Sequence, residues 1–223
     1  MARTILIYGQ PASGKTYSLR TLDPASTVII DVDKKGALPW RGYAKDYSFE
    51  KKNFFRVASL ITLHDTLLKI GNKPENNYIK TVVVDGFNNS MMNEVLFYDE
   101  VNNTNNKFEK YEMLTKRVVK IIDAAQSLRD DLTVVFTAHV ETADPHVATD
   151  VDKVFTPGRQ LKEKIKIESK FLYVFYAKVE NGEFFFETVP NKSTARTPHD
   201  CFEKNIPNDL AAAINIIKSY EEG

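Results

Sequence analysis

Four short apolar runs along the chain are typical of buried β-strands. The runs are continuous rather than alternating in polarity, as expected for strands that are covered on both faces of a parallel sheet. They are TILIY (4–8), STVIIDVD (26–33), YIKTVVVDGF (78–87) and DLTVVFTAHV (131–140). Aspartates follow the second and third runs and a histidine closes the fourth, so polar side chains are expected at one edge of the sheet.

A helical period separates the third and fourth runs. In KFEKYEMLTKRVVKIIDAAQSL (107–128), apolar residues recur at the spacing of one helix face, at Tyr111, Leu114, Val118, Ile121, Ile122 and Ala125. This pattern predicts a helix that packs one face on the sheet. Strands that alternate with helices in this way indicate a three-layer α/β domain.

The last part of the chain predicts a change of strand direction. In FLYVFYAKVENGEFFFETV (171–189), two strand-like runs flank Asn181-Gly182, which is a strong signal for a β-hairpin. The segment 207–223 then shows the pattern of a capped amphipathic helix, DLAAAINIIKSYEE. The sheet is therefore expected to end in an antiparallel hairpin, followed by a C-terminal helix.

Composition places the chain among ordinary globular proteins. With 223 residues, of which 43% are hydrophobic and 27% charged, it is expected to form one domain over residues 1–223. Lysine plus arginine equals aspartate plus glutamate at 30 each, so any site for a polyanion must be local. No apolar run approaches the roughly 18 residues of a membrane span. The single cysteine, Cys201, has no internal disulfide partner and no charged leader is present, so we expect a cytoplasmic protein without membrane contact.

The segment GQPASGKT (9–16) matches the phosphate-binding pattern Gly-x4-Gly-Lys-Ser/Thr. It lies between the first predicted strand and the helix candidate KTYSLRTL, the context in which backbone N–H groups surround phosphate. Lys15 is expected to reach the β- and γ-phosphates, and Thr16 to offer its hydroxyl to Mg²⁺. A glycine-rich turn alone would not explain the lysine and threonine. The residues expected to bind ATP are Gly9, Gln10, Pro11, Ala12, Ser13, Gly14, Lys15, Thr16 and Tyr17.

Three polar side chains at strand ends are candidates for the chemistry. Asp85 follows TVVV, where a carboxylate can hold Mg²⁺ directly or through water. Asp33 lies just beyond the second strand, where a carboxylate could polarise the water that attacks the γ-phosphate; an ordinary solvated strand end is the alternative. His139 closes FTAH and is a candidate γ-phosphate sensor, although a lone histidine is more often structural.

The order of these features resembles the core of RecA-type recombination ATPases, and most closely the short RecA-core proteins of bacteriophages associated with single-strand annealing. The likeness covers most of the chain. VIIDVDKKGAL, VVVDGFNN and VVFTAH resemble the strands that carry the water-activating acid, the magnesium-linked aspartate and a polar sensor. The resemblance implies a RecA-like P-loop NTPase core in which Asp33 is the base, where the family usually has glutamate. His139 would replace the glutamine seen in RecA itself.

The same resemblance implies contacts with other subunits and with DNA. FFFETVPNKSTARTP is similar to a strand and Asn-Lys segment whose cations reach nucleotide on a neighbouring subunit, which points to Lys192 and Arg196; two solvated basic residues are the alternative. TPGRQLKEKIKIESKFLYVF resembles the segment in which a mobile DNA-binding loop ends. The residues expected to contact single-stranded DNA are Phe155, Arg159 and Lys162. The segment 141–156 is acidic, which is not expected of a loop that contacts DNA and argues against the DNA assignment.

The leading hypothesis is a phage-encoded recombination or annealing ATPase of the host cytoplasm that uses ATP and Mg²⁺. Its expected partners are single-stranded DNA, further copies of the chain and a single-strand-binding protein. A small-molecule or nucleoside kinase is one alternative, since those enzymes also begin with a phosphate loop, but Arg159 stands alone where a kinase lid would cluster arginines. A nucleotide-dependent switch with negligible turnover is another, because Asp33 is one methylene shorter than glutamate.

Overall fold

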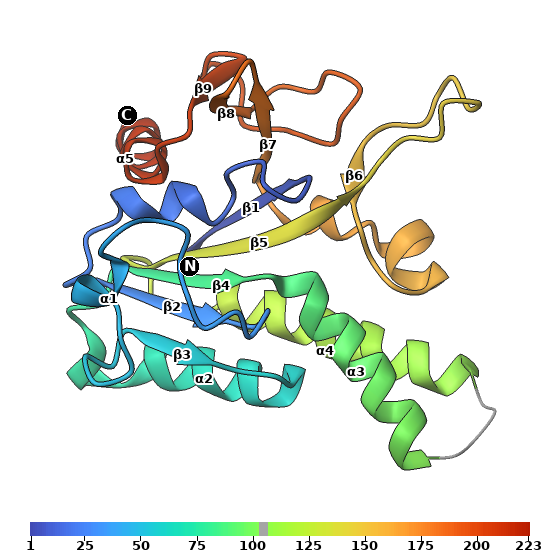
Figure 1. Cartoon of the computed structure of the whole chain (residues 1–223), viewed down its shortest axis with the longest axis horizontal. Coiled ribbons are helices and arrows are strands. Elements are labelled where there is room, and N and C mark those ends of the chain that lie inside the picture. Colours follow the sequence, from blue (N-terminus) through green and yellow to red (C-terminus); the bar gives the residue numbers. More distant parts are fainter. Residues whose placement is uncertain (103–106) are drawn as a thin grey trace.

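The computed structural model describes residues 1–102 and 107–223. It is built around one mixed β-sheet (Figure 1). Its strands are β1 (Arg3–Gly9), β2 (Thr27–Asp31), β3 (Phe54–Arg56), β4 (Thr81–Asp85), β5 (Thr133–Glu141), β6 (Lys153–Val154), β7 (Tyr173–Glu180), β8 (Glu183–Glu187) and β9 (Asn205–Pro207). Over the described residues the strand order is β3-β2-β4-β5-β1-β7-β8-β9, and β6 pairs with β5.

The strand directions agree with the sequence patterns. The pairings of β3, β2, β4, β5, β1 and β7 are parallel, whereas β8 pairs antiparallel with both β7 and β9. The four apolar runs form β1, β2, β4 and β5, and the predicted α/β fold with a mostly parallel sheet and a C-terminal antiparallel hairpin is confirmed. The edge strand β3 escaped prediction, because a three-residue run, FFR, carries too little periodicity to be recognised.

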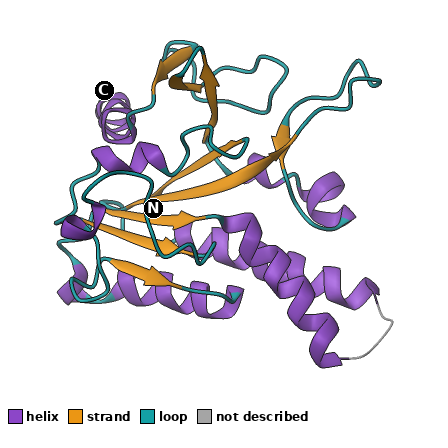
Figure 2. Cartoon of the chain, viewed as in Figure 1, coloured by secondary structure: helices purple, strands orange, loops and turns teal. Residues whose placement is uncertain are grey.

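Helices cover both faces of the sheet, and the core is divided accordingly (Figure 2). The helices are α1 (Tyr43–Asp46), α2 (Leu60–Asn72), α3 (Phe87–Asn102), α4 (Lys107–Gln126) and α5 (Leu210–Glu222). Leu6 and Tyr8 of β1 belong to the core beneath α2, α3 and α4. Their neighbours Ile5 and Ile7 point to the other face and pack with α5. Three layers result, as the alternation of strands and helices predicts.

The C-terminal elements are held by local turn and cap chemistry. Asn181 and Gly182 have φ values of 52° and 83°, which is the left-handed geometry of a tight hairpin turn between β7 and β8. Asp209 caps α5, because its side chain accepts a hydrogen bond from the backbone N–H of Ala212 at 2.9 Å. The helix therefore begins at Leu210 rather than at Pro207, which ends β9.

Candidate nucleotide-binding site

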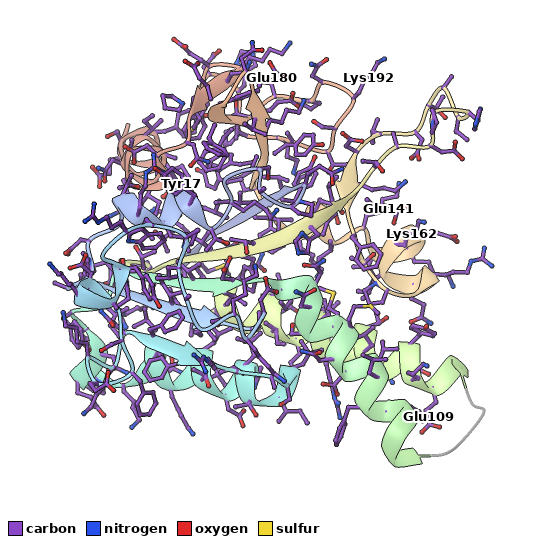
Figure 3. The ribbon with its side chains drawn as sticks, viewed as in Figure 1. Tyr17, Glu109, Glu141, Lys162, Glu180 and Lys192 are labelled. Atoms are coloured by element: carbon purple, nitrogen blue, oxygen red, sulfur yellow. The ribbon has the colours of Figure 1, made fainter. Side chains whose placement is uncertain are left out.

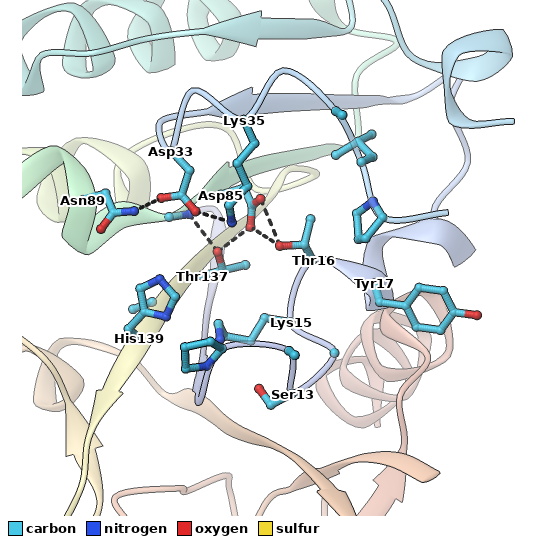
Figure 4. Close-up of a pocket in the computed structure, with 18 of the residues that line it drawn as sticks. Ser13, Lys15, Thr16, Tyr17, Asp33, Lys35, Asp85, Asn89, Thr137 and His139 are labelled. Carbon is cyan, nitrogen blue, oxygen red and sulfur yellow. Dashed lines mark hydrogen bonds and ion pairs between the residues drawn. The ribbon is translucent and has the colours of Figure 1, made fainter. Parts of the chain in front are cut away.

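The glycine-rich segment turns sharply after β1 and lines a pocket (Figure 4). Ala12 and Gly14 have positive φ values of 61° and 90°, conformations that can aim successive backbone N–H groups at one anion. A Cβ on Gly9 would lie 2.4 Å from the carbonyl oxygen of Ala177, so only glycine fits where β1 approaches β7. The pocket has a volume of about 780 Å³, which is enough for a nucleotide.

The helix after the loop is shorter than the sequence pattern predicts. Tyr17–Thr21 forms a short 3₁₀ helix, and Asp23-Pro24 follows before β2 begins. Proline disfavours helical backbone in the residue that precedes it, so the segment has little room to continue as an α-helix. The partial charge of a helix N-terminus is small here, and the positive potential of the pocket depends on loop amides and lysines.

Lys15 lies inside the pocket with its ammonium group turned onto the loop. Its Nζ donates to the carbonyl oxygens of Gly9 at 2.8 Å and Gln10 at 2.6 Å, and the residue is only 8% exposed. Burial lowers the pKa of Lys15 to about 8. The charge of a buried ammonium group is only partly compensated when its hydrogen bonds go to neutral carbonyl groups. An anion would stabilise that charge, which fits the predicted contact of Lys15 with phosphate.

Asp85 ends β4 beside two threonine hydroxyls (Figure 4). Thr16 Oγ1 lies 3.0 Å from both carboxylate oxygens, and Thr137 Oγ1 donates to Oδ1 at 2.6 Å. Asp85 is buried, and burial raises the pKa of its carboxyl group. A hydroxyl next to a carboxylate provides the oxygen ligands that Mg²⁺ prefers, so Thr16 and Asp85 fit the metal role expected of them.

Asp33 also lines the pocket, held between two partners (Figure 4). The side-chain amide of Asn89, in α3, donates to Oδ1. The ammonium group of Lys35 lies 2.5 Å from Oδ2. The side chain of Asp33 is only 4% exposed, so the predicted base is fixed in place and partly covered by these neighbours.

His139 reaches the pocket because β5 lies between β1 and β4, which makes it the register partner of Gly9. Its backbone N–H donates to Oδ1 of Asn88 at 3.1 Å. Its buried Nδ1 has no hydrogen-bond partner among the described residues, as is also true of Oγ of Ser13 in the loop. Burial, with the nearby charge of Lys15, lowers the pKa of His139, so the ring is neutral near pH 7. These two unpaired polar groups favour a polar ligand in the pocket.

Lys192 and Arg196 lie outside this pocket. Figure 3 shows Lys192 on the loop between β8 and β9, well away from Tyr17 at the loop and 3₁₀ helix. The residue is exposed, and its φ is 54°. The guanidinium group of Arg196 donates to the carbonyl oxygens of Ser169 and Phe171 in its own chain. The two predicted cations therefore differ: the side chain of Arg196 is hydrogen-bonded to the backbone of its own chain, whereas Lys192 is exposed.

The residues predicted to contact DNA follow an extension of the chain that we call the β5–β6 arm, residues 142–152 (Figure 1). Phe155 follows β6, and its backbone N–H donates to the carbonyl oxygen of His139 at 2.9 Å. Lys162 pairs with Glu141 at 2.7 Å at the base of the arm (Figure 3). Arg159 is 87% exposed and pairs with Glu163. Both cations are paired with carboxylates in this structure, so neither side chain is available to a phosphate without exchange of its partner.

Sequence reasoning missed several residues that shape the pocket. Lys35 and Asn89 hold Asp33, and Thr137 holds Asp85. Asn208 donates its side-chain amide to the carbonyl oxygen of Gly14 at 3.2 Å and accepts from Arg20. Lys35 and Thr137 lie within two residues of predicted positions, so their spacing from Asp33 and His139 could have drawn attention to them. Nothing near Asn208 in the sequence points to the loop.

Comparison with known proteins agrees with this geometry. Residues 1–202 match the family model described as AAA domain. No curated protein matches the chain. Within the described ranges, no helix is both long enough and apolar enough to cross a membrane. A glycine-rich loop with Lys15 and Thr16 after β1, a carboxylate at the end of β4 and a largely parallel sheet are features of P-loop NTPases. The chain belongs to the AAA domain family of P-loop NTPases.

Proposed function

We propose that the chain couples ATP hydrolysis to the binding of single-stranded DNA, in recombination or annealing of the RecA-core type. The observation that carries the proposal is the course of β5. His139 lines the nucleotide pocket, and the same strand enters the β5–β6 arm after Glu141. The carbonyl oxygen of His139 also accepts a hydrogen bond from Phe155, on the far side of the arm. A change at the γ-phosphate would therefore have a short physical route to the arm.

The groups that line the pocket fit the roles that hydrolysis requires. Loop amides and Lys15 would hold the β- and γ-phosphates, and Asp33 would accept a proton from the attacking water. As that water bonds to the γ-phosphorus, the bond to the bridging oxygen breaks and ADP leaves with its negative charge. P-loop ATPases of this family generally use Mg²⁺, and Thr16 and Asp85 would hold an ion that neutralises charge on the phosphates.

The charges at the base of the arm favour DNA binding that can be switched. Lys162 and Arg159 contact Glu141 and Glu163, so each must exchange a carboxylate for a DNA phosphate. Exposed ion pairs are worth roughly 0–1 kcal/mol, so such an exchange costs little. Phe155 would add stacking on a base. Lys192, which is exposed, would reach nucleotide on a neighbouring copy of the chain.

DNA binding in different nucleotide states tests the proposal. A fluorescent single-stranded oligonucleotide is titrated by anisotropy with protein in the presence of Mg²⁺ and either a non-hydrolysable ATP analogue or ADP. We expect the analogue to tighten binding about ten-fold, within the usual range of coupling between sites, and Lys15→Ala to remove the difference. Equal affinities in the two nucleotide states would contradict the proposal.

A nucleotide-dependent switch with negligible turnover is a second candidate. The observation that favours it is the pairing of Lys35 with Asp33, which engages one oxygen of the proposed base. In that case the analogue would still tighten DNA binding, but phosphate release would stay at the level of Asp33→Asn, with or without DNA.

A further inference from the structure

The turn after β2 is built to place Lys35 at the pocket. The residues on either side of it, Lys34 and Gly36, have positive φ values of 57° and 69°. Left-handed backbone at a lysine is unfavourable and persists only where the surroundings enforce it. The hydrogen bond from the N–H of Gly36 to Oδ2 of Asp31 at 2.7 Å holds this turn, and the positive φ of Gly36 is one that glycine adopts without strain. The turn therefore returns the chain to the pocket wall at Lys35.

Lys35 and Asp33 form an ion pair with one fixed and one movable partner. Asp33 is held by Asn89 through its other oxygen, and its side chain is 4% exposed. The side chain of Lys35 is 56% exposed, and within the described residues its ammonium group forms an ion pair only with Oδ2 of Asp33. A lysine stem has four rotatable bonds, so the ammonium group can leave the carboxylate without movement of the backbone.

The charges of the pocket favour an anion close to Lys35. Lys35 and Lys15 line the same pocket and carry like charges, and Lys35 contributes to the lowered pKa of Lys15, after burial. Burial opposes the charged form of Lys35, but the hydrogen bond and charge of Asp33 outweigh it and raise the pKa of Lys35. Two ammonium groups that both stay charged near one cavity would each be stabilised by a phosphate group that lies between them.

We propose that Lys35 is a ligand of the γ-phosphate supplied by the same chain as the phosphate-binding loop. In the structure Lys35 covers Asp33; with ATP present its ammonium group moves from the carboxylate to the terminal phosphate, which leaves Oδ2 of Asp33 open to accept a proton from water. The assignment rests on the proposed ATP site, and it adds a cation that works without a neighbouring subunit. Lys192 would then complete the site rather than provide its main positive charge.

Selectivity for triphosphate over diphosphate distinguishes this role from simple neutralisation of Asp33. A ligand of the γ-phosphate contributes to binding of an ATP analogue and little to binding of ADP. The dissociation constants of both nucleotides are measured by calorimetry, in Mg²⁺, for the wild type and for Lys35→Ala, Lys35→Arg and Lys34→Ala. Lys34 is the matched control, because it carries the same charge one residue away and does not line the pocket.

We expect Lys35→Ala to weaken the ATP analogue about ten-fold or more, as for loss of a charge-assisted hydrogen bond, with ADP changed less than about three-fold. Lys35→Arg should retain most of the preference for the triphosphate, and Lys34→Ala should match the wild type. An unchanged ratio of the two dissociation constants in Lys35→Ala would overturn the assignment.

A double variant separates a direct contact from an indirect effect. Lys35→Ala also leaves the carboxylate of Asp33 uncompensated, which by itself would repel a triphosphate. In Asp33→Asn combined with Lys35→Ala that repulsion is gone, so a direct contact predicts that the preference stays lost relative to Asp33→Asn alone. Recovery of the preference in the double variant would show that Lys35 only neutralises Asp33.

The nucleotide-binding test of Lys35 does not depend on whether single-stranded DNA is the partner of the protein. Loss of triphosphate preference without any effect of DNA on the protein would support the role of Lys35 and contradict the proposed function. Wild-type protein that binds neither nucleotide would overturn both.

Discussion

Gly9 and His139 are register partners on the adjacent strands β1 and β5. The first residue of the phosphate-binding loop therefore lies beside the last part of β5, which ends at Glu141 where the β5–β6 arm begins. Because β5 separates β1 from β4, the loop, the carboxylate of Asp85 and the ring of His139 meet at one edge of the sheet. This adjacency is the structural basis of the proposed coupling between nucleotide and arm, and the following predictions test its parts.

The lowered pKa of Lys15 predicts that triphosphate binding takes up protons. Burial holds this pKa at about 8 in the free protein, well below that of an exposed lysine. A bound phosphate favours the charged form and raises the pKa again, so at pH 8 binding should take up about half a proton per site. Calorimetry in two buffers with different ionisation enthalpies measures this number. Lys15→Arg stays protonated throughout, so it should show a smaller uptake; an equal uptake would exclude Lys15 as its source.

The same pKa predicts how stability depends on pH without nucleotide. The unfolded chain keeps Lys15 protonated to a higher pH than the folded chain, so the folded state gains stability relative to the unfolded state as pH rises above about 8. Urea denaturation between pH 7.5 and 9.5 should show the wild type gaining stability relative to Lys15→Met. A constant difference between the two proteins over this range would contradict the shift.

Thr137→Val is expected to damage the site and the fold. Thr137 Oγ1 donates to Asp85 at 2.6 Å and accepts from the backbone N–H of Gly86 at 2.8 Å. Its loss leaves buried polar groups unpaired, at a cost of about 1–3 kcal/mol in the free energy of unfolding. Thr133→Val is the matched control on β5, because Thr133 is buried and its hydroxyl lacks a partner among the described residues. Thermal denaturation should show a loss for Thr137→Val alone, and equal effects of the two changes would count against this role.

Asn208→Ala is expected to destabilise the phosphate-binding loop, because it removes a hydrogen bond to the backbone of that loop. The buried side chain of Asn208 donates to the carbonyl oxygen of Gly14, and its own oxygen atoms accept from Arg20. We expect the variant to lose about 1 kcal/mol of stability and to bind both ATP analogue and ADP more weakly. Asn205→Ala, at an exposed position of β9, is the control. Nucleotide affinity equal to that of the wild type would remove Asn208 from the support of the loop.

Lys192 and Arg196 should respond differently to alanine substitution. Arg196→Ala removes hydrogen bonds to the carbonyl oxygens of Ser169 and Phe171, so it should lower the melting temperature. Lys192→Ala should leave the melting temperature unchanged while it lowers ATP turnover. If Lys192 acts on a neighbouring site, a mixture of Lys192→Ala and Lys15→Ala subunits should regain activity. A mixture no more active than either variant would contradict action between subunits.

The sequence predicted those parts of the fold and site that are encoded locally. The phosphate-binding loop is one contiguous motif, and Asp33, Asp85 and His139 each come at or just after the end of a clear apolar run that forms a strand. The 3₁₀ helix after the loop was missed, because the loop motif predicts a helix and the proline that limits it is seven residues further on. The start of α5 was misplaced by three residues, since the cap at Asp209 depends on a side-chain hydrogen bond.

The remaining site residues depend on tertiary structure. Asn208 lies 194 residues after the glycine that it supports, and only the return of α5 to the loop brings the two together. Lys35 reaches the pocket through two left-handed residues, a geometry that the letters KKG do not specify. Arg196 looked like a second free cation in the sequence, but its hydrogen bonds depend on the packing of the segment that ends at Phe171.

The rate of ATP hydrolysis with and without single-stranded DNA tests the central claim most directly. Phosphate release is followed in Mg²⁺ for the wild type, Lys15→Ala and Asp33→Asn, with a saturating single-stranded oligonucleotide or none. The account predicts slow turnover without DNA, a several-fold increase with DNA, and loss of both rates in the two variants. The account would be contradicted by an ATP hydrolysis rate that does not change with DNA and is retained in Asp33→Asn. Transfer of the phosphate to a nucleoside instead of water would also contradict it.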